Sequence, residues 1–346
     1  MRIRERLANI AAVEGVVVAL IFLAMIIFFS LSSPYFLGSQ NLRNLFVEST
    51  FTVLLAAGTS YVLIVGGIDL SIGSVLGVSA GLTLLTMQKT NSLPLAIAVG
   101  LASGAAIGLL NGGLIAGMGI NPFIVTLATL SIFAGGLNVL TTRAQLIGTP
   151  SKSFASLAQG SVFGLPSPVL ITAIVVILLE LVLIVTPFGR RIYAAGINDR
   201  AAHMAGVNLR RLRLQVYILS GAIAGLAGIL LASKLNSVQP GLGSGYELTA
   251  IAAAVIGGVG LSGGQGSVWR SVIGALFLAT LSQGMQLLSI SSTWFTVVTG
   301  ISIVAAIAFS RMTQRLAATV RPAASPPEPT QPEPEPSEDR TPAAAG

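Results

Sequence analysis

The acid Asp69 is the most conspicuous residue of this chain that could do chemistry, because it interrupts the apolar stretch IVGGIDLSIGSVLGVSAGL at 64–82. Gly67 precedes it and Ser71 follows it, a combination typical of a break between two helices. A carboxylate here can accept backbone N–H bonds at a helix N-terminus, where the macrodipole also favours it. Asp69 is therefore a structural cap or, since acids in membrane segments are costly unless paired or used, part of a gate or of its coupling to the cytoplasmic side.

Glu180 is another acid within a long apolar run, ITAIVVILLELVLIV at 171–185. It could relay protons in a secondary transporter, although an interhelical hydrogen bond or protonation is the more ordinary role of such an acid. Neutral amides and a helix break suit a different chemistry, hydrogen bonding to an uncharged hydroxylated solute, although asparagine also caps and packs. The candidates to line a path for such a solute are Asn111, Asn121, Pro122, Phe123 and Asn138.

Catalytic and metal chemistry are not predicted. The chain has no cysteine, which excludes disulfides, thiolate metal sites and thiol nucleophiles, and His203 is its only histidine. We therefore expect no catalytic residue and no metal site.

The elements that position these residues are predicted by the composition. Of 346 residues, 53% are hydrophobic and 9% are charged, against about 25% charged in an ordinary soluble domain. Apolar runs of about 20 residues, enough to span a bilayer as a helix, recur between Val16 and Phe309. They lack the alternation of a membrane β-barrel. The net charge of +7 could suggest nucleic acid, but no reading motif accompanies it.

We predict an all-α integral membrane protein with about ten transmembrane helices and both termini in the cytoplasm. Fourteen of the 19 lysines and arginines then lie inside and five lie outside, as the positive-inside rule requires. The predicted parts are a cytoplasmic N-terminus at 1–15, a transmembrane domain at 16–310 and a disordered cytoplasmic tail at 311–346, rich in proline and glutamate. The predicted spans are 16–36, 46–66, 70–87, 93–118, 121–142, 167–186, 214–233, 248–264, 268–288 and 293–310.

Glycines at small-xxx-small spacing predict close helix packing, inside the bundle or at a dimer seam. They are Gly100, Gly104, Gly108 and Gly112 in one span, and Gly221 and Gly225 in another.

A short helix is predicted in the basic cytoplasmic segment 187–213. Asn198 can cap it, its body runs from Asp199 to Ala205, and Gly206 can stop it. Its small residues would leave room for the helix to enter a cleft, so it is either a docking element for another subunit or a membrane-surface loop with arginines. The docking residues would be Asn198, Asp199, Arg200, Ala201, Ala202, His203, Met204, Ala205 and Gly206.

Several phrases together resemble the permease family of ribose, xylose, arabinose and galactose ATP-binding-cassette importers. The resemblance runs in order from about residue 35 to 310. The phrases are GGIDLSIGS at 66–74, INPFIVTLATLSIFAGGLNVLT at 120–141, FGRRIYAAGINDRAAHMAGVNLRRLRLQVYILSGAIAGLAGIL at 188–230 and GGVGLSGGQGSVWRSVIGALF at 257–277.

The resemblance implies a permease subunit in a bacterial inner membrane that carries a monosaccharide by alternating access and catalyses no reaction itself. In similar permeases the loop at 198–206 is a coupling helix seated in the ATPase subunit. The implied partners are that ATPase, which would hold ATP and magnesium while this chain binds no cofactor, a periplasmic sugar-binding protein and a second permease copy, identical or paralogous. The alternatives are a permease for a nucleoside or other small polar solute, and an ion-coupled secondary transporter that would require Glu180.

The residues LSGGQ at 261–265 spell the signature of ATP-binding-cassette ATPase domains. A nucleotide site would also need the phosphate-binding pattern G-x-x-x-x-G-K-[ST], and the chain contains no glycine-lysine pair. We therefore interpret LSGGQ as a tight glycine turn between two spans.

Overall fold

The structure, a computed structural model, describes residues 19–142, 144–149, 151–291, 293–302, 304–305 and 308. The predicted N-terminus at 1–15 and the predicted tail at 311–346 lie outside the described residues, as does the start of the predicted span 16–36.

Helices make up most of the described chain, as predicted. They are Ala19–Ser32, α2 (Ser39–Ile64), α3 (Ile72–Thr90), α4 (Leu93–Met118), α5 (Pro122–Leu140), α6 (Lys152–Gln159), α7 (Ser167–Val185), α8 (Pro187–Ile197), α9 (Asp199–Met204), α10 (Leu209–Leu235), α11 (Tyr246–Ile256), α12 (Val268–Leu287) and helical residues 293–302. The strands described form two short antiparallel pairs, β1 (Leu146–Ile147) with β4 (Ser237–Val238) and β2 (Ser161–Val162) with β3 (Leu165–Pro166).

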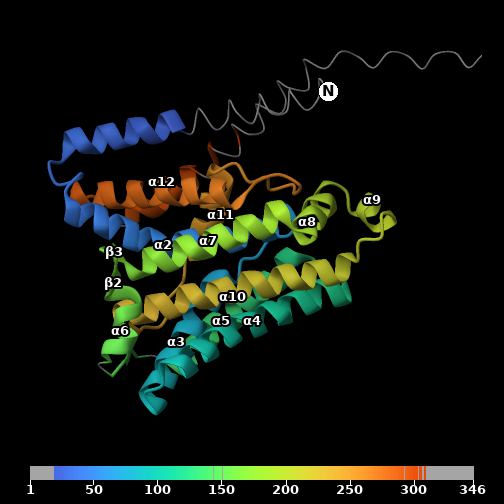
Figure 1. Ribbon diagram of the computed structural model, residues 1–346, viewed down its shortest axis with the longest axis horizontal. Coiled ribbons are helices and arrows are strands. Elements are labelled where there is room, and N and C mark those ends of the chain that lie inside the picture. Colours follow the sequence, from blue (N-terminus) through green and yellow to red (C-terminus); the bar gives the residue numbers. More distant parts are fainter. Residues whose placement is uncertain are drawn as a thin grey trace, which may run out of the picture.

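The long helices lie side by side, and the molecule has two distinct ends (Figure 1). α6, β2 and β3 lie at one end, and α9, which continues directly from α8, projects at the other. The basic residues of α10 lie at these two ends. Arg210, Arg211 and Arg213, predicted to lie inside, are in its first turns, and Lys234, predicted to lie outside, is in its last turn.

Five described helices are long and apolar enough to cross a membrane, namely α2, α4, α5, α7 and α10. The predicted span 248–264 is wrong as a continuous helix, because α11 ends at Ile256 after 11 residues. Gly257 and Gly258 follow, and Gly258 has a φ of +93°, a conformation that a helix does not contain and that glycine adopts readily.

Burial in this bundle runs opposite to that in a soluble protein. The most apolar of the five helices, α7, is only 33% buried along its most apolar 18 residues, whereas the least apolar, α2, is 83% buried. Lipid tails are as apolar as leucine, so an outward apolar face costs nothing in a bilayer. The arrangement therefore favours a membrane environment for the described helices.

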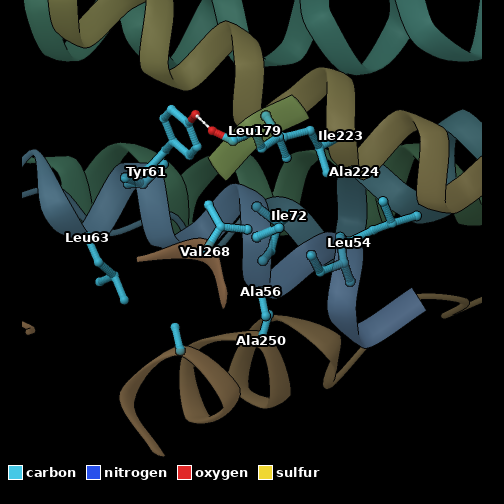
Figure 2. Packing of buried hydrophobic residues seen from close by; sticks show 14 of the residues in the cluster. Leu54, Ala56, Tyr61, Leu63, Ile72, Leu179, Ile223, Ala224, Ala250 and Val268 are labelled. Atoms are coloured by element: carbon cyan, nitrogen blue, oxygen red, sulfur yellow. Dashed lines mark hydrogen bonds between the residues drawn. The ribbon is translucent and has the colours of Figure 1, made fainter. Parts of the chain in front are cut away.

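The central helix α2 packs against several others through side chains that water cannot reach (Figure 2). Leu54 and Tyr61 of α2 are fully buried, and Ala250 of α11 and Val268 of α12 belong to the same cluster. The hydroxyl of Tyr61 donates to the carbonyl oxygen of Leu179 in α7, which satisfies a buried polar group.

The glycine spacing produces a seam between α4 and α10 inside the chain, so the packing prediction is confirmed. A Cβ atom added to Gly104 would lie 2.2 Å from the carbonyl oxygen of Gly221, and one added to Gly108 would lie 2.2 Å from that of Tyr217. The two backbones approach closely because both helices present hydrogen atoms there.

Candidate functional site

The short helix α9 has the predicted cap, body and stop. The side-chain oxygen of Asn198 accepts a hydrogen bond from the backbone N–H of Ala201 at 3.0 Å. The helix ends at Met204, one residue earlier than predicted, and Gly206 follows with a φ of +82°. The backbone N–H of Val207 donates to the carbonyl oxygen of Ala202 and completes a glycine-based C-terminal turn.

The outward surface of α9 is apolar at its tip. Met204 is 88% exposed and Ile197, the last residue of α8, is 73% exposed, and Ala201, His203 and Ala205 are also exposed. Exposed apolar side chains at a protruding turn are typical of an interaction site.

Ala202 differs from the prediction that the small residues of α9 enter a partner's cleft. It is 4% exposed and belongs to the main hydrophobic cluster of the chain itself. One side of the short helix α9 packs on this chain and the other side faces outward. The methyl group of Ala202 lies on the packed side. Ala202 therefore anchors α9 to this chain, and the exposed residues of α9 form its outer surface.

One ion pair ties α9 to the beginning of α10. The guanidinium of Arg213 donates to the carboxylate of Asp199, and both side chains are partly exposed. Such a pair contributes less than about 1 kcal/mol, so it orients α9 more than it stabilises the fold. Arg200, Arg210 and Arg211 are exposed around it, which gives this end of the molecule a positive surface.

The predicted helix break at Gly67, Asp69 and Ser71 separates α2 from α3. α2 ends at Ile64, α3 begins at Ile72, and Asp69 between them is 2% exposed. One carboxylate oxygen of Asp69 accepts from the backbone N–H of Ser71 at 2.9 Å and from its hydroxyl at 2.6 Å. The other accepts from the hydroxyl of Ser220 in α10 at 3.2 Å. The carboxylate thus closes a turn before α3 begins and caps no N–H group within that helix, and it also joins the break to α10.

Asn111 belongs to this buried polar cluster. It is 0% exposed, and its side-chain NH₂ donates to the hydroxyl of Ser71 at 2.8 Å, while its side-chain oxygen has no partner among the described residues. The structure therefore places Asn111 in the interior of the chain, and its lining of a path stays a prediction. Tyr217 completes the cluster by donating to the carbonyl oxygen of Ile68 at 3.1 Å.

The other path-lining candidates do not form one site. Asn121, Pro122 and Phe123 begin α5, where the side-chain oxygen of Asn121 accepts from the backbone N–H of Phe123 and caps the helix. Asn138 lies near the other end of α5, roughly 25 Å away at 1.5 Å per residue. Asn121, Phe123 and Asn138 are exposed, so α5 keeps a partly polar outward face.

Glu180 is a helix cap and not a free acid. It is 8% exposed, and one of its oxygens accepts from the backbone N–H groups of Val268 at 2.7 Å and Trp269 at 3.4 Å. These are the first two residues of α12, whose N–H groups have no partner within the helix. The interhelical hydrogen bond expected of Glu180 is confirmed, and a proton relay has no support here.

The sequence LSGGQ forms the predicted glycine turn. Residues 257–267 lie outside helices and strands, and Gly263 and Gly264 have φ values of +85° and +72°. The turn connects α11 with α12 at the same end as α8.

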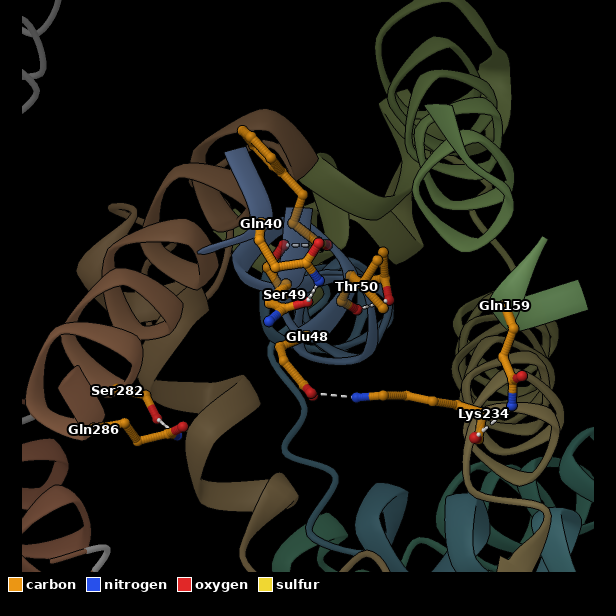
Figure 3. A network of polar contacts seen from close by, with 11 residues as sticks. Gln40, Glu48, Ser49, Thr50, Gln159, Lys234, Ser282 and Gln286 are labelled. Atoms are coloured by element: carbon orange, nitrogen blue, oxygen red, sulfur yellow. Dashed lines mark hydrogen bonds and ion pairs between the residues drawn. The ribbon is translucent and has the colours of Figure 1, made fainter. Parts of the chain in front are cut away.

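The end opposite α9 carries a polar network that the sequence did not reveal (Figure 3). Lys234 at the end of α10 pairs with Glu48 of α2, and Gln159 of α6 donates to the carbonyl oxygen of Lys234. The pairing joins residues 186 positions apart, so no local pattern could predict it. Tyr217 and Ser220 were also missed, although their spacing of three on an apolar helix places both on one face.

Comparison with known proteins gives a consistent result. Residues 41–307 match the family described as branched-chain amino acid transport system / permease component. The ribose import permease protein of Bacillus subtilis (strain 168) is 38% identical over 288 residues, which cover 83% of this chain and 89% of that protein. The D-allose transport system permease protein of Escherichia coli (strain K12) is 37% identical over 83% and 88% of the two chains. The L-arabinose transport system permease protein of the same strain is 38% identical over 88% and 92%. No solved structure matches the chain.

Proposed function

Because the chain belongs to the family of branched-chain amino acid transport system permease components, we propose that it is the membrane-spanning permease subunit of an ATP-binding-cassette importer for a monosaccharide. The observation that carries the substrate class is the likeness to permeases of ribose, allose and arabinose along more than four fifths of each chain. The family description alone would also fit an amino acid. The protein is a transport subunit of the inner membrane, and we assign it no reaction.

The proposed topology has about ten spans with both termini in the cytoplasm. The end with α9 then faces the cytoplasm, and the end with α6 faces the outer side of the inner membrane. The charges of α10 support this orientation, since its arginines lie at the α9 end.

We propose that α9 docks into a cytoplasmic ATPase subunit that holds ATP and magnesium. The exposed tip at Ile197 and Met204 and the arginines around it support this role. A periplasmic binding protein would deliver the sugar to the opposite end, and two permease copies, identical or paralogous, would enclose the path. The break at Asp69 would belong to the moving part of the path, because its buried carboxylate links α3 to α10.

Docking is tested by placing a charge on the tip of α9. We expect Met204→Asp to abolish co-purification of the ATPase subunit, because a carboxylate at the centre of an apolar contact would lose its hydration. Phe163→Asp is the matched control, since Phe163 is 98% exposed between β2 and β3 at the opposite end. Retention of the ATPase by Met204→Asp, with both variants folded in the membrane, would contradict the docking role.

The alternative substrates are a nucleoside or another small polar solute. Uptake of each candidate solute into proteoliposomes separates a sugar from a nucleoside or another polar solute. Adding or withholding the ATPase and the binding protein separates an importer from an ion-coupled transporter. A sugar importer requires both added proteins, whereas uptake driven by a pH gradient alone would contradict the proposed function.

A further inference from the structure

Three backbone segments meet beside α9 with no side chain between them. They are the end of α2 at Ile64, the end of α8 at Gly196 and the glycine turn at Gly264, and we call this contact the glycine junction. The backbone N–H of Gly264 donates to the carbonyl oxygen of Ile64 at 2.8 Å. A Cβ atom added to Gly196 would lie 1.9 Å from that oxygen and 2.4 Å from the nitrogen of Gly264.

A tyrosine closes the glycine junction from the side of α8. The hydroxyl of Tyr193 donates to the carbonyl oxygen of Gly266 at 2.6 Å. Burial, and next the negative charge of Glu180, raise the pKa of the Tyr193 phenol, so it remains a donor at neutral pH. Gly264 also lies against Ile197, where an added Cβ would be 2.6 Å from the Cγ1 atom of Ile197. The turn therefore holds α8 at its last two residues, Gly196 and Ile197, and only Asn198 separates them from α9.

The other side of the glycine junction leads to Asp69. Only Val65 to Ile68 separate Ile64 from Asp69. In this connection Gly67 lies against the hydroxyl of Tyr217, which donates to the carbonyl oxygen of Ile68. The connection between α2 and α3 is thus held at one end by the glycine junction and at the other by the buried polar cluster of α4 and α10.

Resting on the proposed function, we propose that the glycine junction transmits displacements of α9 to the connection that carries Asp69, and that Tyr193 and Gly196 are positioning residues for transport. Direct backbone contacts suit this task, because they leave no flexible side chain to absorb the movement. The junction then couples ATPase docking at α9 with a rearrangement at the break between α2 and α3.

Tyr193→Phe tests the proposal with little change in shape, because it removes only the donor. In the complete complex in proteoliposomes, we expect the ATPase to stay bound and sugar uptake per ATP hydrolysed to fall about twofold to tenfold, the range for one hydrogen bond. Tyr246→Phe is the matched control at the opposite end of the molecule, and we expect it to leave this ratio unchanged.

Gly196→Ala provides a larger perturbation, and Gly113→Ala is its control, since an added Cβ on Gly113 would meet nothing within 4 Å. We expect uptake per ATP to fall further in Gly196→Ala than in Tyr193→Phe. If the Gly196→Ala variant does not assemble with the ATPase, the result for Tyr193→Phe alone tests the proposal. An unchanged ratio in Tyr193→Phe, or loss of the ATPase from that variant, would overturn the proposal.

A second measurement does not depend on the transported solute. A cysteine replacing Ile68 reports on the connection through its rate of maleimide labelling, with and without ATP in the presence of the ATPase. We expect ATP to change this rate, and Tyr193→Phe to reduce the change about twofold or more. An equal ATP-dependent change in the labelling rate with and without Tyr193→Phe would overturn the proposal. Absence of sugar uptake by the unaltered complex would contradict only the proposed substrate.

Discussion

Among the described residues two acids are buried, Asp69 and Glu180, and each accepts hydrogen bonds from nearby donors. Asp69 accepts from two hydroxyls and one backbone N–H, and Glu180 accepts from two backbone N–H groups at the start of α12. A helix N-terminus favours negative charge, so Glu180 gains from the dipole of α12 as well as from the hydrogen bonds. Neither acid contacts a lysine or arginine in the hydrogen bonds of the described residues.

The role of Glu180 as a cap predicts different effects for two substitutions. Glu180→Gln keeps an oxygen that can accept from Val268, so we expect energised uptake to remain largely intact. Glu180→Leu leaves that N–H buried without a partner, which should lower stability by about 1–3 kcal/mol. Thermal unfolding in detergent and uptake measured on both variants check this. Loss of uptake in Glu180→Gln together with uptake driven by a pH gradient would indicate a proton relay instead.

At the scale of elements, several glycines together create a close seam between α4 and α10. Each helix places a hydrogen atom where the partner backbone lies, and Gly104 and Gly108 fit against Gly221 and Tyr217. Without a hydrophobic driving force in lipid, such van der Waals packing is a main source of helix association. The seam also fixes the height of Asn111 on α4 relative to Ser220 on α10, and so supports the cluster around Asp69.

Gly104→Ala should therefore be costly although the added group is only a methyl. Its Cβ would lie 2.2 Å from a backbone oxygen, which cannot rotate away, so we expect a loss of about 1–3 kcal/mol. Gly113→Ala on the same helix is the control and should be neutral or slightly stabilising, since alanine favours helices. Thermal unfolding of the two variants measures the difference. Equal unfolding temperatures would mean that the seam is loose.

The elements that the sequence predicted well are those specified by neighbouring residues. The break at Asp69, the cap of α9 at Asn198 and the glycine turn at 261–265 each depend on residues close in the chain. The inward side of Ala202, the partner of Glu180 and the pair of Lys234 with Glu48 depend on how distant helices pack. α11 was predicted too long because hydropathy does not register that Gly258 takes a conformation no helix contains.

At the scale of the whole molecule, the long helices run along one axis between two ends that carry different elements. One end carries α9 and the arginines around it, and the other carries α6 and the network of Glu48 with Lys234 (Figures 1 and 3). α2, the most buried of the five helices long enough to cross a membrane, runs between them and ends at the glycine junction. A movement imposed on one end can therefore reach the interior through a helix that is itself largely buried, without unfolding the outward helices.

The orientation of this axis in the membrane is open to a direct test, because the native chain has no cysteine. Ser153 in α6 and Arg200 in α9 are exposed at opposite ends. We expect a membrane-impermeant maleimide to label Ser153→Cys in intact cells whose outer membrane has been opened. It should label Arg200→Cys only after the inner membrane is permeabilised, since arginines are retained on the cytoplasmic side. Ala56→Cys, at a fully buried position, should be labelled in neither condition. A cytoplasmic C-terminus further requires that a cysteine at Ser337 behave like the one at position 200. The reverse pattern at Ser153 and Arg200 would place α9 outside the cell, where no ATPase could reach it, and would remove the basis for its docking role.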